Sequence, residues 1–166
     1  MAGEGRLNRD GQIAGVGVVQ SINLPEFFQG AGAAELQLIG RFRNQQTKGQ
    51  DYDGDFYDLG TTLFVPLPWK LKGDVGVNFG IEDYRNPNSL DFQNRRRHDA
   101  EFAFSAGLTR PLNEWAAIRA DYQYVNHDSN VLTPGGVDPD TGLPVPSENP
   151  YEFSHHVVGI RMIFTY

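Results

Sequence analysis

The chain has 166 residues, a formal net charge of −7 and no cysteine, which suits about one domain and excludes disulfides, thiolate metal sites and thiol nucleophiles. The acidic balance argues against a nucleic-acid partner, because phosphate binding needs a basic surface. The longest nearly apolar run, 63–69, contains two prolines and is far too short for a membrane-spanning helix.

Alternation of apolar and polar residues, the period of a β-strand, recurs along most of the chain and predicts about seven strands. In chain order the alternating segments are 13–22, which is the weakest, 35–43, 57–65, 72–82, 99–110, 116–124 and 156–166. Most approach the roughly 9–11 residues that a tilted strand needs to cross a bilayer, whereas strands of soluble sheets usually have about 5–6. A soluble β-protein with a ligand cavity is the alternative that the average hydropathy allows.

The connections between these segments are expected to alternate between short turns and long polar loops. Short turns are expected at 25–32, 66–70 and 111–114, and long loops near 45–56, 85–98 and 126–150. Short turns at one end and long loops at the other are typical of an outer-membrane barrel. The sequence therefore predicts an all-β fold, a transmembrane antiparallel up-and-down β-barrel, with residues 1–10 as a leader on the extracellular side and 11–166 as the barrel strands.

Aromatic residues gather toward both ends of the predicted strands, as in the two aromatic girdles of membrane barrels. At the short-turn end these residues are Phe27, Phe28, Trp69, Trp115, Phe164 and Tyr166. Toward the long-loop end they are Tyr52, Phe56, Tyr57, Tyr84, Phe92, Tyr124, Tyr151 and Phe153. Ordinary strand composition is the competing explanation, since Tyr and Phe favour sheets in any case.

The last strand carries a terminal aromatic with apolar residues at every second position before it and a glycine preceding them. The residues of this pattern are Gly159, Ile160, Met162, Phe164 and Tyr166. The pattern resembles the closing strand of the Gram-negative outer-membrane β-barrel family. The resemblance implies an insertion signal read by the barrel-assembly machinery, membrane lipids as partners, and an outer-membrane location. The loop spacing and the segment 126–130 are similar to barrels that follow tetratricopeptide repeats in outer-membrane export proteins.

Strand parity predicts that this barrel is not closed by the chain alone. Bacterial single-chain barrels have an even number of strands with both ends on the periplasmic side. Seven strands do not satisfy this rule, and residues 1–10 contain one large apolar residue, Leu7. The remaining strands are expected from the same or another chain, and a larger parent chain accounts for the lack of a visible export signal at 1–6.

One face of the predicted barrel is polar and carries both signs of charge. Its residues are expected to line the lumen: Glu35, Gln37, Arg41, Arg43, Asp58, Lys72, Asp74, Asn78, Glu82, Asp99, Glu101, Arg119, Asp121 and Arg161. A channel that passes a solute or an exported polymer through this charged lumen is the favoured function. The alternative is a structural or adhesion barrel whose lumen is closed by paired side chains and whose external loops bind a partner.

Two groups of side chains raise the possibility of a metal. Asp51, Asp53 and Asp55 alternate around Gly54, and calcium binds oxygen clusters on flexible loops, but a solvated acidic loop is the favoured interpretation. The pair 155–156 consists of two histidines, which point to opposite faces of a strand and so do not chelate together. No cofactor is expected.

Two further groups are candidates for binding and catalysis. The basic cluster Arg95-Arg96-Arg97 followed by His98 is expected on an external loop, where lipopolysaccharide phosphates or the nearby carboxylates are candidate partners. Ser105 with His98 or His127 would be the available parts of a hydrolase, but no motif surrounds them. The chain is therefore not expected to be an enzyme.

Overall fold

The computed structural model describes residues 9–136 and 143–164, which form one antiparallel sheet of seven strands in chain order. The strands are β1 (Gly11–Leu24), β2 (Ala34–Thr47), β3 (Gly54–Pro66), β4 (Lys72–Pro87), β5 (Arg96–Pro111), β6 (Ala116–Ser129) and β7 (Phe153–Phe164). Two single 3₁₀ turns, η1 (Gln50–Tyr52) and η2 (Pro68–Lys70), lie in connections. The predicted all-β, up-and-down arrangement with seven strands is confirmed.

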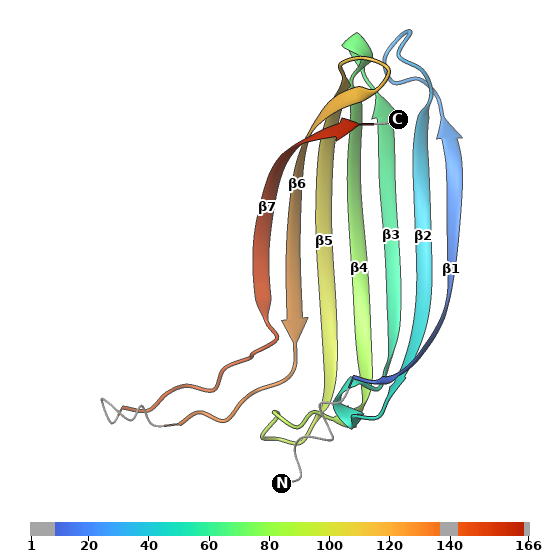
Figure 1. The fold of residues 1–166 in the computed structure, drawn as a ribbon. Helices are drawn as coiled ribbons and strands as arrows, with labels where there is room; N and C mark the ends of the chain where they lie inside the picture. Colours follow the sequence, from blue (N-terminus) through green and yellow to red (C-terminus); the bar gives the residue numbers. More distant parts are fainter. Residues whose placement is uncertain (1–8, 137–142, 165–166) are drawn as a thin grey trace.

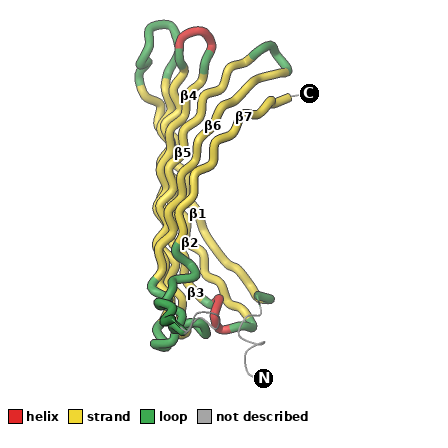
Figure 2. The backbone as a smooth tube through the Cα atoms, turned by 90° about the vertical axis from the view of Figure 1, so that its left-hand side faces the viewer, coloured by secondary structure: helices red, strands yellow, loops and turns green. Residues whose placement is uncertain are grey.

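The sheet is open and consists of a single layer, as the two perpendicular views show (Figures 1 and 2). Each strand pairs with its neighbours in sequence, so β1 pairs with β2 alone and β7 with β6 alone among the described residues. The outer edges of β1 and β7 are therefore unpaired within this part of the chain, and the sheet does not close into a barrel.

The strands are longer than the alternating segments predicted, with 12 residues in β7 and 16 in β4 and β5. Their ends extend into the expected long loops, which shrink to 48–53, 88–95 and 130–152. Polar cross-strand contacts explain the extension: Asp55 accepts a hydrogen bond from Asn44 at 2.6 Å and lies against Arg85. The segment 126–130, expected in a loop, lies mostly in β6.

The three short connections lie together at the opposite end of the sheet from 48–53, 88–95 and 130–152 (Figure 1). The first of them, 25–33, is nevertheless longer than 48–53, so the difference in length between the two ends rests mainly on 130–152. Gly30 (φ 74°) and Gly32 (φ 103°) adopt positive φ in this first turn, where a Cβ would be strained.

Buried residues concentrate near the 48–53, 88–95 and 130–152 end, and the middle of the sheet has no continuous core. The buried hydrophobic residues are Ala34, Phe56, Tyr84, Ala116, Val125 and Val131. Buried polar and charged residues are as numerous, among them Asp51, Asp91, Arg97, Asp99 and His127. Most large apolar side chains of the strands are instead exposed on the sheet surface.

Candidate functional site

Cross-strand register sorts the side chains of the sheet onto two faces of opposite character. Residues paired in register share a face, and neighbours along a strand point to opposite faces. The residues predicted to line a lumen all share one face, named here the polar face: Glu35, Gln37, Arg41, Arg43, Asp58, Lys72, Asp74, Asn78, Glu82, Asp99, Glu101, Arg119, Asp121 and Arg161. The other face, named the apolar face, carries aliphatic and aromatic side chains.

A network of ion pairs crosses the polar face near the short turns. Arg119 of β6 donates two hydrogen bonds to the carboxylate of Asp74 on β4, at 2.6 and 2.8 Å. It crosses β5 above Gly107, where an added Cβ would lie 2.0 Å from the guanidinium. Arg161 of β7 lies 3.1 Å from Asp121, which is 3.6 Å from Arg119. These charged side chains therefore lie along the sheet and link β4, β6 and β7.

A second cluster lies at the other end of the polar face, around a fully buried carboxylate. Asp99 is 0% exposed and accepts a hydrogen bond from Nε of Arg97 at 2.6 Å. His127 Nε2 lies 3.2 Å from the same Asp99 oxygen, and its Nδ1 is 3.6 Å from Glu101. Asp99 Oδ1 and His127 Nδ1 have no hydrogen-bond partner among the described residues. An unpaired buried charge is unfavourable, so the contact between Arg97 and Asp99 matters for the stability of this end of the sheet.

Aromatic rings cover this cluster. The guanidinium of Arg97 lies 4.5 Å from the ring centroid of Tyr84 and 3.6 Å from that of Tyr151. His127 stacks on Phe153 with a centroid separation of 5.0 Å. Phe56 packs edge to face against Tyr84, at 5.6 Å. Register places Phe56, Tyr84 and Phe153, three of the aromatic residues expected toward the long-loop end, on the polar face together with the residues predicted to line a lumen.

Sequence reasoning left Arg97, Tyr84 and His127 out of the predicted inward face. The alternation of β5 and β4 holds the missing signal: Arg97 continues the odd-numbered series of Asp99, and Tyr84 continues the even-numbered series of β4. The alternating segments predicted from the sequence stop at 82, begin at 99 and stop at 124, so Tyr84, Arg97 and His127 fall just outside them.

Two arginines of β2 stand without an ion-pair contact among the described residues of the polar face. Arg41 and Arg43 form no ion pair among the described residues, although Arg43 lies 4.5 Å from the centroid of Phe56. Asp58 of β3 pairs in register with Arg41, and Glu82 of β4 lies in register with Arg43 across Phe56 of β3. Arg41 and Arg43 of β2 thus face Asp58 of β3 and Glu82 of β4 across the strands.

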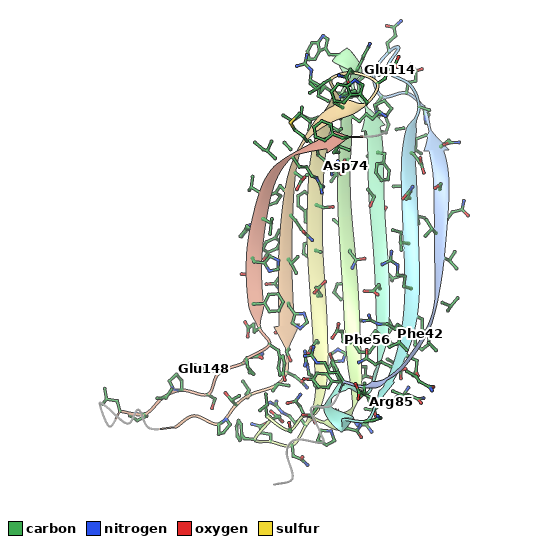
Figure 3. The ribbon with its side chains drawn as sticks, in the orientation of Figure 1. Phe42, Phe56, Asp74, Arg85, Glu114 and Glu148 are labelled. Atoms are coloured by element: carbon green, nitrogen blue, oxygen red, sulfur yellow. The ribbon has the colours of Figure 1, made fainter. Side chains whose placement is uncertain are left out.

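The three aspartates of the weak calcium candidate are held by separate partners. Asp51 accepts hydrogen bonds from the amide and hydroxyl of Ser89, and Asp53 accepts from the hydroxyl of Thr47 at 3.0 Å. Asp55 is held by Arg85, labelled in Figure 3, with 2.9 Å between Nη2 and Oδ1. In the described ranges no group of three His, Cys, Asp or Glu residues could hold a metal ion.

The basic cluster 95–97 is divided among internal partners. Arg95 pairs with Asp91 at 2.9 Å, while Arg97 pairs with Asp99 on the polar face. The hydrogen bond from Arg95 holds the pKa of the Asp91 carboxyl well below its usual range, and the backbone amide of Leu132 adds to the effect. Two of the three guanidinium groups are therefore committed within the protein, which weakens the case for a lipopolysaccharide contact through this cluster.

Register also separates the remaining candidate residues. His155 pairs with Val125 on the polar face, whereas His156 lies on the apolar face and its Nδ1 is 2.8 Å from the Tyr122 hydroxyl. Ser105 lies on the polar face and His98 on the apolar face. Ser105 pairs in register with Gln123, four residues along β6 from His127. The sheet therefore brings neither histidine to Ser105.

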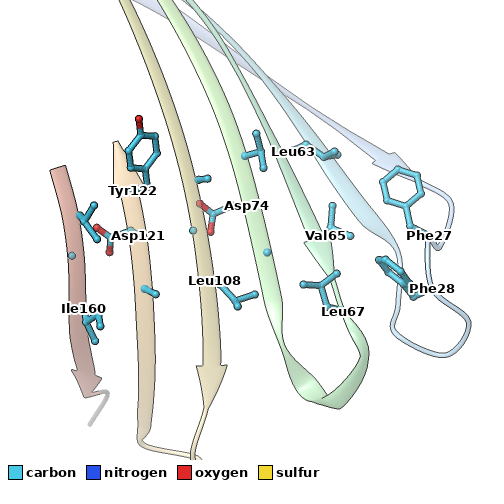
Figure 4. A pocket seen from close by; sticks show the side chains of 17 residues that line it. Phe27, Phe28, Leu63, Val65, Leu67, Asp74, Leu108, Asp121, Tyr122 and Ile160 are labelled. Atoms are coloured by element: carbon cyan, nitrogen blue, oxygen red, sulfur yellow. The ribbon is translucent and has the colours of Figure 1, made fainter. Parts of the chain in front are cut away.

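The apolar face exposes large hydrophobic side chains that no other described segment covers. Val18 is 67%, Leu59 67% and Ile160 77% exposed. Near the short turns this face has a hollow of about 820 Å³, whose labelled side chains in Figure 4 include Phe28, Leu63 and Leu108. Contiguous exposed apolar surface of this kind marks contact with another protein or with lipid.

The predicted insertion signal lies on β7, on both of its faces. Ile160, Met162 and Phe164 belong to the apolar face, and Phe164 stacks on Trp115 at 6.0 Å. Gly159 lies on the polar face, where an added Cβ would be 2.9 Å from an Asp121 oxygen. Tyr166 lies outside the described residues.

Comparison with protein families, with curated proteins and with solved structures finds no match to this chain. Within the described ranges, no helix is long and apolar enough to span a membrane.

Proposed function

We propose that this chain forms part of an outer-membrane β-barrel channel of a Gram-negative bacterium, which passes a solute or an exported polymer through a charged lumen. The polar face lines the lumen and the apolar face contacts lipid. The observation that carries this proposal is the register, which collects most strand charges on one face and many exposed hydrophobic side chains on the other. The charged residues that share the apolar face lie toward the strand ends: Asp55, Asp83, Arg85, Arg96, Arg110 and Asp128. Outer-membrane strands alternate in this way between lipid and lumen.

Strand length supports a membrane-spanning role. The shortest strand, β7, has 12 residues, and β4 has 16. At about 3.3 Å per residue and a tilt of about 40°, 12 residues rise roughly 30 Å, which exceeds the apolar band of about 25 Å. Each strand is therefore long enough to cross the band and still place its ends in the interfaces.

The two unpaired sheet edges support the presence of further strands in the complete assembly. Open edges in hydrocarbon would leave backbone N–H and C=O groups without partners, which costs several kcal/mol per group. We infer that strands from the same or another chain complete the barrel, that the barrel-assembly machinery inserts it through β7, and that membrane lipids and, at the outer rim, lipopolysaccharide surround it.

A structural or adhesion barrel with a closed lumen is the second candidate. The observation that favours it is the network of Arg119, Asp74, Asp121 and Arg161, which lies along the sheet and fills part of the polar face with paired side chains. Arg41 and Arg43 favour the channel instead, because charged side chains that form no ion pair are expected along the wall of an open lumen.

Single-channel recording in planar bilayers tests the proposal, with the full-length barrel. The channel predicts discrete conductance steps, and the charge reversal Arg41→Glu with Arg43→Glu predicts a reversal potential shifted toward cation selectivity. The matched control, Lys48→Glu with Arg96→Glu, changes the same charge on exposed residues at the ends of strands. Absence of conductance from correctly folded protein would favour the closed barrel, and equal shifts in both variants would contradict a lumen lined by the polar face.

A further inference from the structure

A pocket of about 350 Å³ opens on the polar face at the end that holds 48–53, 88–95 and 130–152. Its walls come from segments far apart in the sequence: Arg9 before β1, Arg43 on β2, Tyr52 in η1, Glu82 on β4 and Tyr151 before β7 are among the lining residues. The pocket is distinct from the turn-end ion-pair network, which shares none of its lining residues.

Each guanidinium at this pocket lies over an aromatic ring. Arg9 is 4.5 Å from the centroid of Tyr52, Arg43 is 4.5 Å from that of Phe56, and Arg97 stacks on Tyr151. Stacking fixes the plane of a guanidinium and leaves its N–H edges free to donate. Rings and guanidinium planes thus form the walls, with hydrogen-bond donors at their edges.

The donors of this pocket are only partly used. Arg97 is neutralised by Asp99, but Arg43 has no ion pair among the described residues. Arg9 donates a hydrogen bond to the Tyr52 hydroxyl at 3.3 Å. Glu82 accepts the Tyr84 hydroxyl at 2.7 Å through one carboxylate oxygen. Within the described ranges, the pocket therefore offers two guanidinium groups that form no ion pair, beside the carboxylate of Glu82.

This combination matches a ligand that has an acidic group, several hydroxyls and an apolar ring face. Guanidinium forks bind carboxylate or phosphate through paired hydrogen bonds. Carboxylate oxygens accept hydroxyl protons, and the C–H faces of a sugar ring pack on aromatic rings. A purely apolar ligand would leave the arginines unsolvated, and a free metal cation would be repelled by them.

We propose that this arginine–tyrosine pocket binds an acidic sugar unit, with the carboxylate or phosphate on Arg43 and Arg9 and the ring hydroxyls on Glu82. That an acidic sugar passes through the lumen rests on the proposed channel. That an acidic sugar binds in this pocket does not depend on the channel. An acidic saccharide in solution and the phosphorylated sugars of lipopolysaccharide share this chemistry.

Isothermal titration calorimetry on folded protein in detergent tests binding, with trigalacturonate as the acidic probe and maltotriose as the neutral one. Trigalacturonate is expected to bind at least about tenfold more tightly than maltotriose. Arg43→Gln and Arg9→Gln should each weaken trigalacturonate binding about tenfold or more, because each removes a hydrogen bond to a charged group. Arg110→Gln is the matched control, since Arg110 lies on the apolar face. Arg9 precedes β1, so its variant tests the pocket without altering a strand.

Equal affinity for both sugars, unchanged affinity in Arg9→Gln and Arg43→Gln, or no binding to folded protein would each overturn the inference. Current block in planar bilayers distinguishes the two sources. Trigalacturonate that blocks wild-type current but spares Arg43→Gln supports a saccharide in transit. Competition by lipopolysaccharide without block supports the lipid-anchored sugar. Calorimetric binding without any conductance would leave the pocket standing and refute the channel.

Discussion

Gly107→Ala isolates the contribution of the turn-end ion pairs. The new Cβ would lie 2.0, 2.4 and 2.7 Å from the guanidinium atoms of Arg119, so the guanidinium must leave its position over β5. Arg119 is flexible at its far end, and the cost is therefore the lost ion pair with Asp74 rather than a backbone clash. The two side chains are 20% and 15% exposed. An ion pair that is neither fully exposed nor fully buried contributes about 1–3 kcal/mol to the free energy of unfolding.

Replacing glycine in a strand also lowers the entropy of the unfolded chain, which offsets about 0.5–1 kcal/mol of this loss. The matched control is Gly40→Ala on the apolar face, where the added Cβ meets Leu59 at 3.8 Å, an ordinary contact. We expect Gly107→Ala to lower the free energy of unfolding and Gly40→Ala to leave it unchanged or slightly raised.

Guanidinium-chloride unfolding in phospholipid vesicles measures both variants, and a double-mutant cycle with Arg119→Ala measures the coupling directly. In the Arg119→Ala background, Gly107→Ala should no longer destabilise the protein. Two results would contradict a stabilising role for the Arg119–Asp74 ion pair across β5: Gly107→Ala being as stable as Gly40→Ala, or Gly107→Ala remaining destabilising in the Arg119→Ala background.

Three further predictions test the two faces and the loops. Val77→Arg on the apolar face should cost about 2–4 kcal/mol in vesicle unfolding, whereas Asn78→Arg on the polar face should be tolerated. Asp99→Ala should cost about 3–5 kcal/mol because it leaves a buried guanidinium unpaired, whereas Asp58→Ala, which breaks no ion pair among the described residues, should change stability by less than about 0.5 kcal/mol. The pKa of Asp91 is lowered in the folded protein, so its ionised carboxylate stabilises the fold above its unfolded pKa of about 3.9, and this stabilisation declines as the pH falls below that value. Protection of the Leu132 amide from hydrogen exchange should follow this pH dependence, and Asp91→Asn should abolish it.

The strand pattern and the faces could be predicted from alternation alone. Segments such as 99–110 alternate strictly, and a period of two assigns each residue to a face whatever its partner. The strand ends could not be located in this way. Residues such as Arg97 and His127 are polar, and a polar residue at the end of a strand has the same composition as a loop.

The contacts of the site depend on register, which composition does not specify. Arg119 reaches Asp74 because Gly107 separates them on β5, and Tyr151 reaches Arg97 because the segment before β7 returns to the same height. Each contact joins residues dozens of positions apart. Alternation predicts which face a residue shares, but pairing decides which neighbour it meets.

The glycines of the strands favour one direction of curvature. All of them except Gly40 and Gly73 lie on the polar face, where an aspartate or arginine side chain lies over Gly80, Gly107 and Gly159. A sheet that rolls brings the side chains of its inner surface closer together and spreads those of the outer surface. Small residues on the polar face and bulky ones on the apolar face therefore make rolling toward the polar face sterically easier. In a completed cylinder, the same asymmetry would leave room for water along the inner wall.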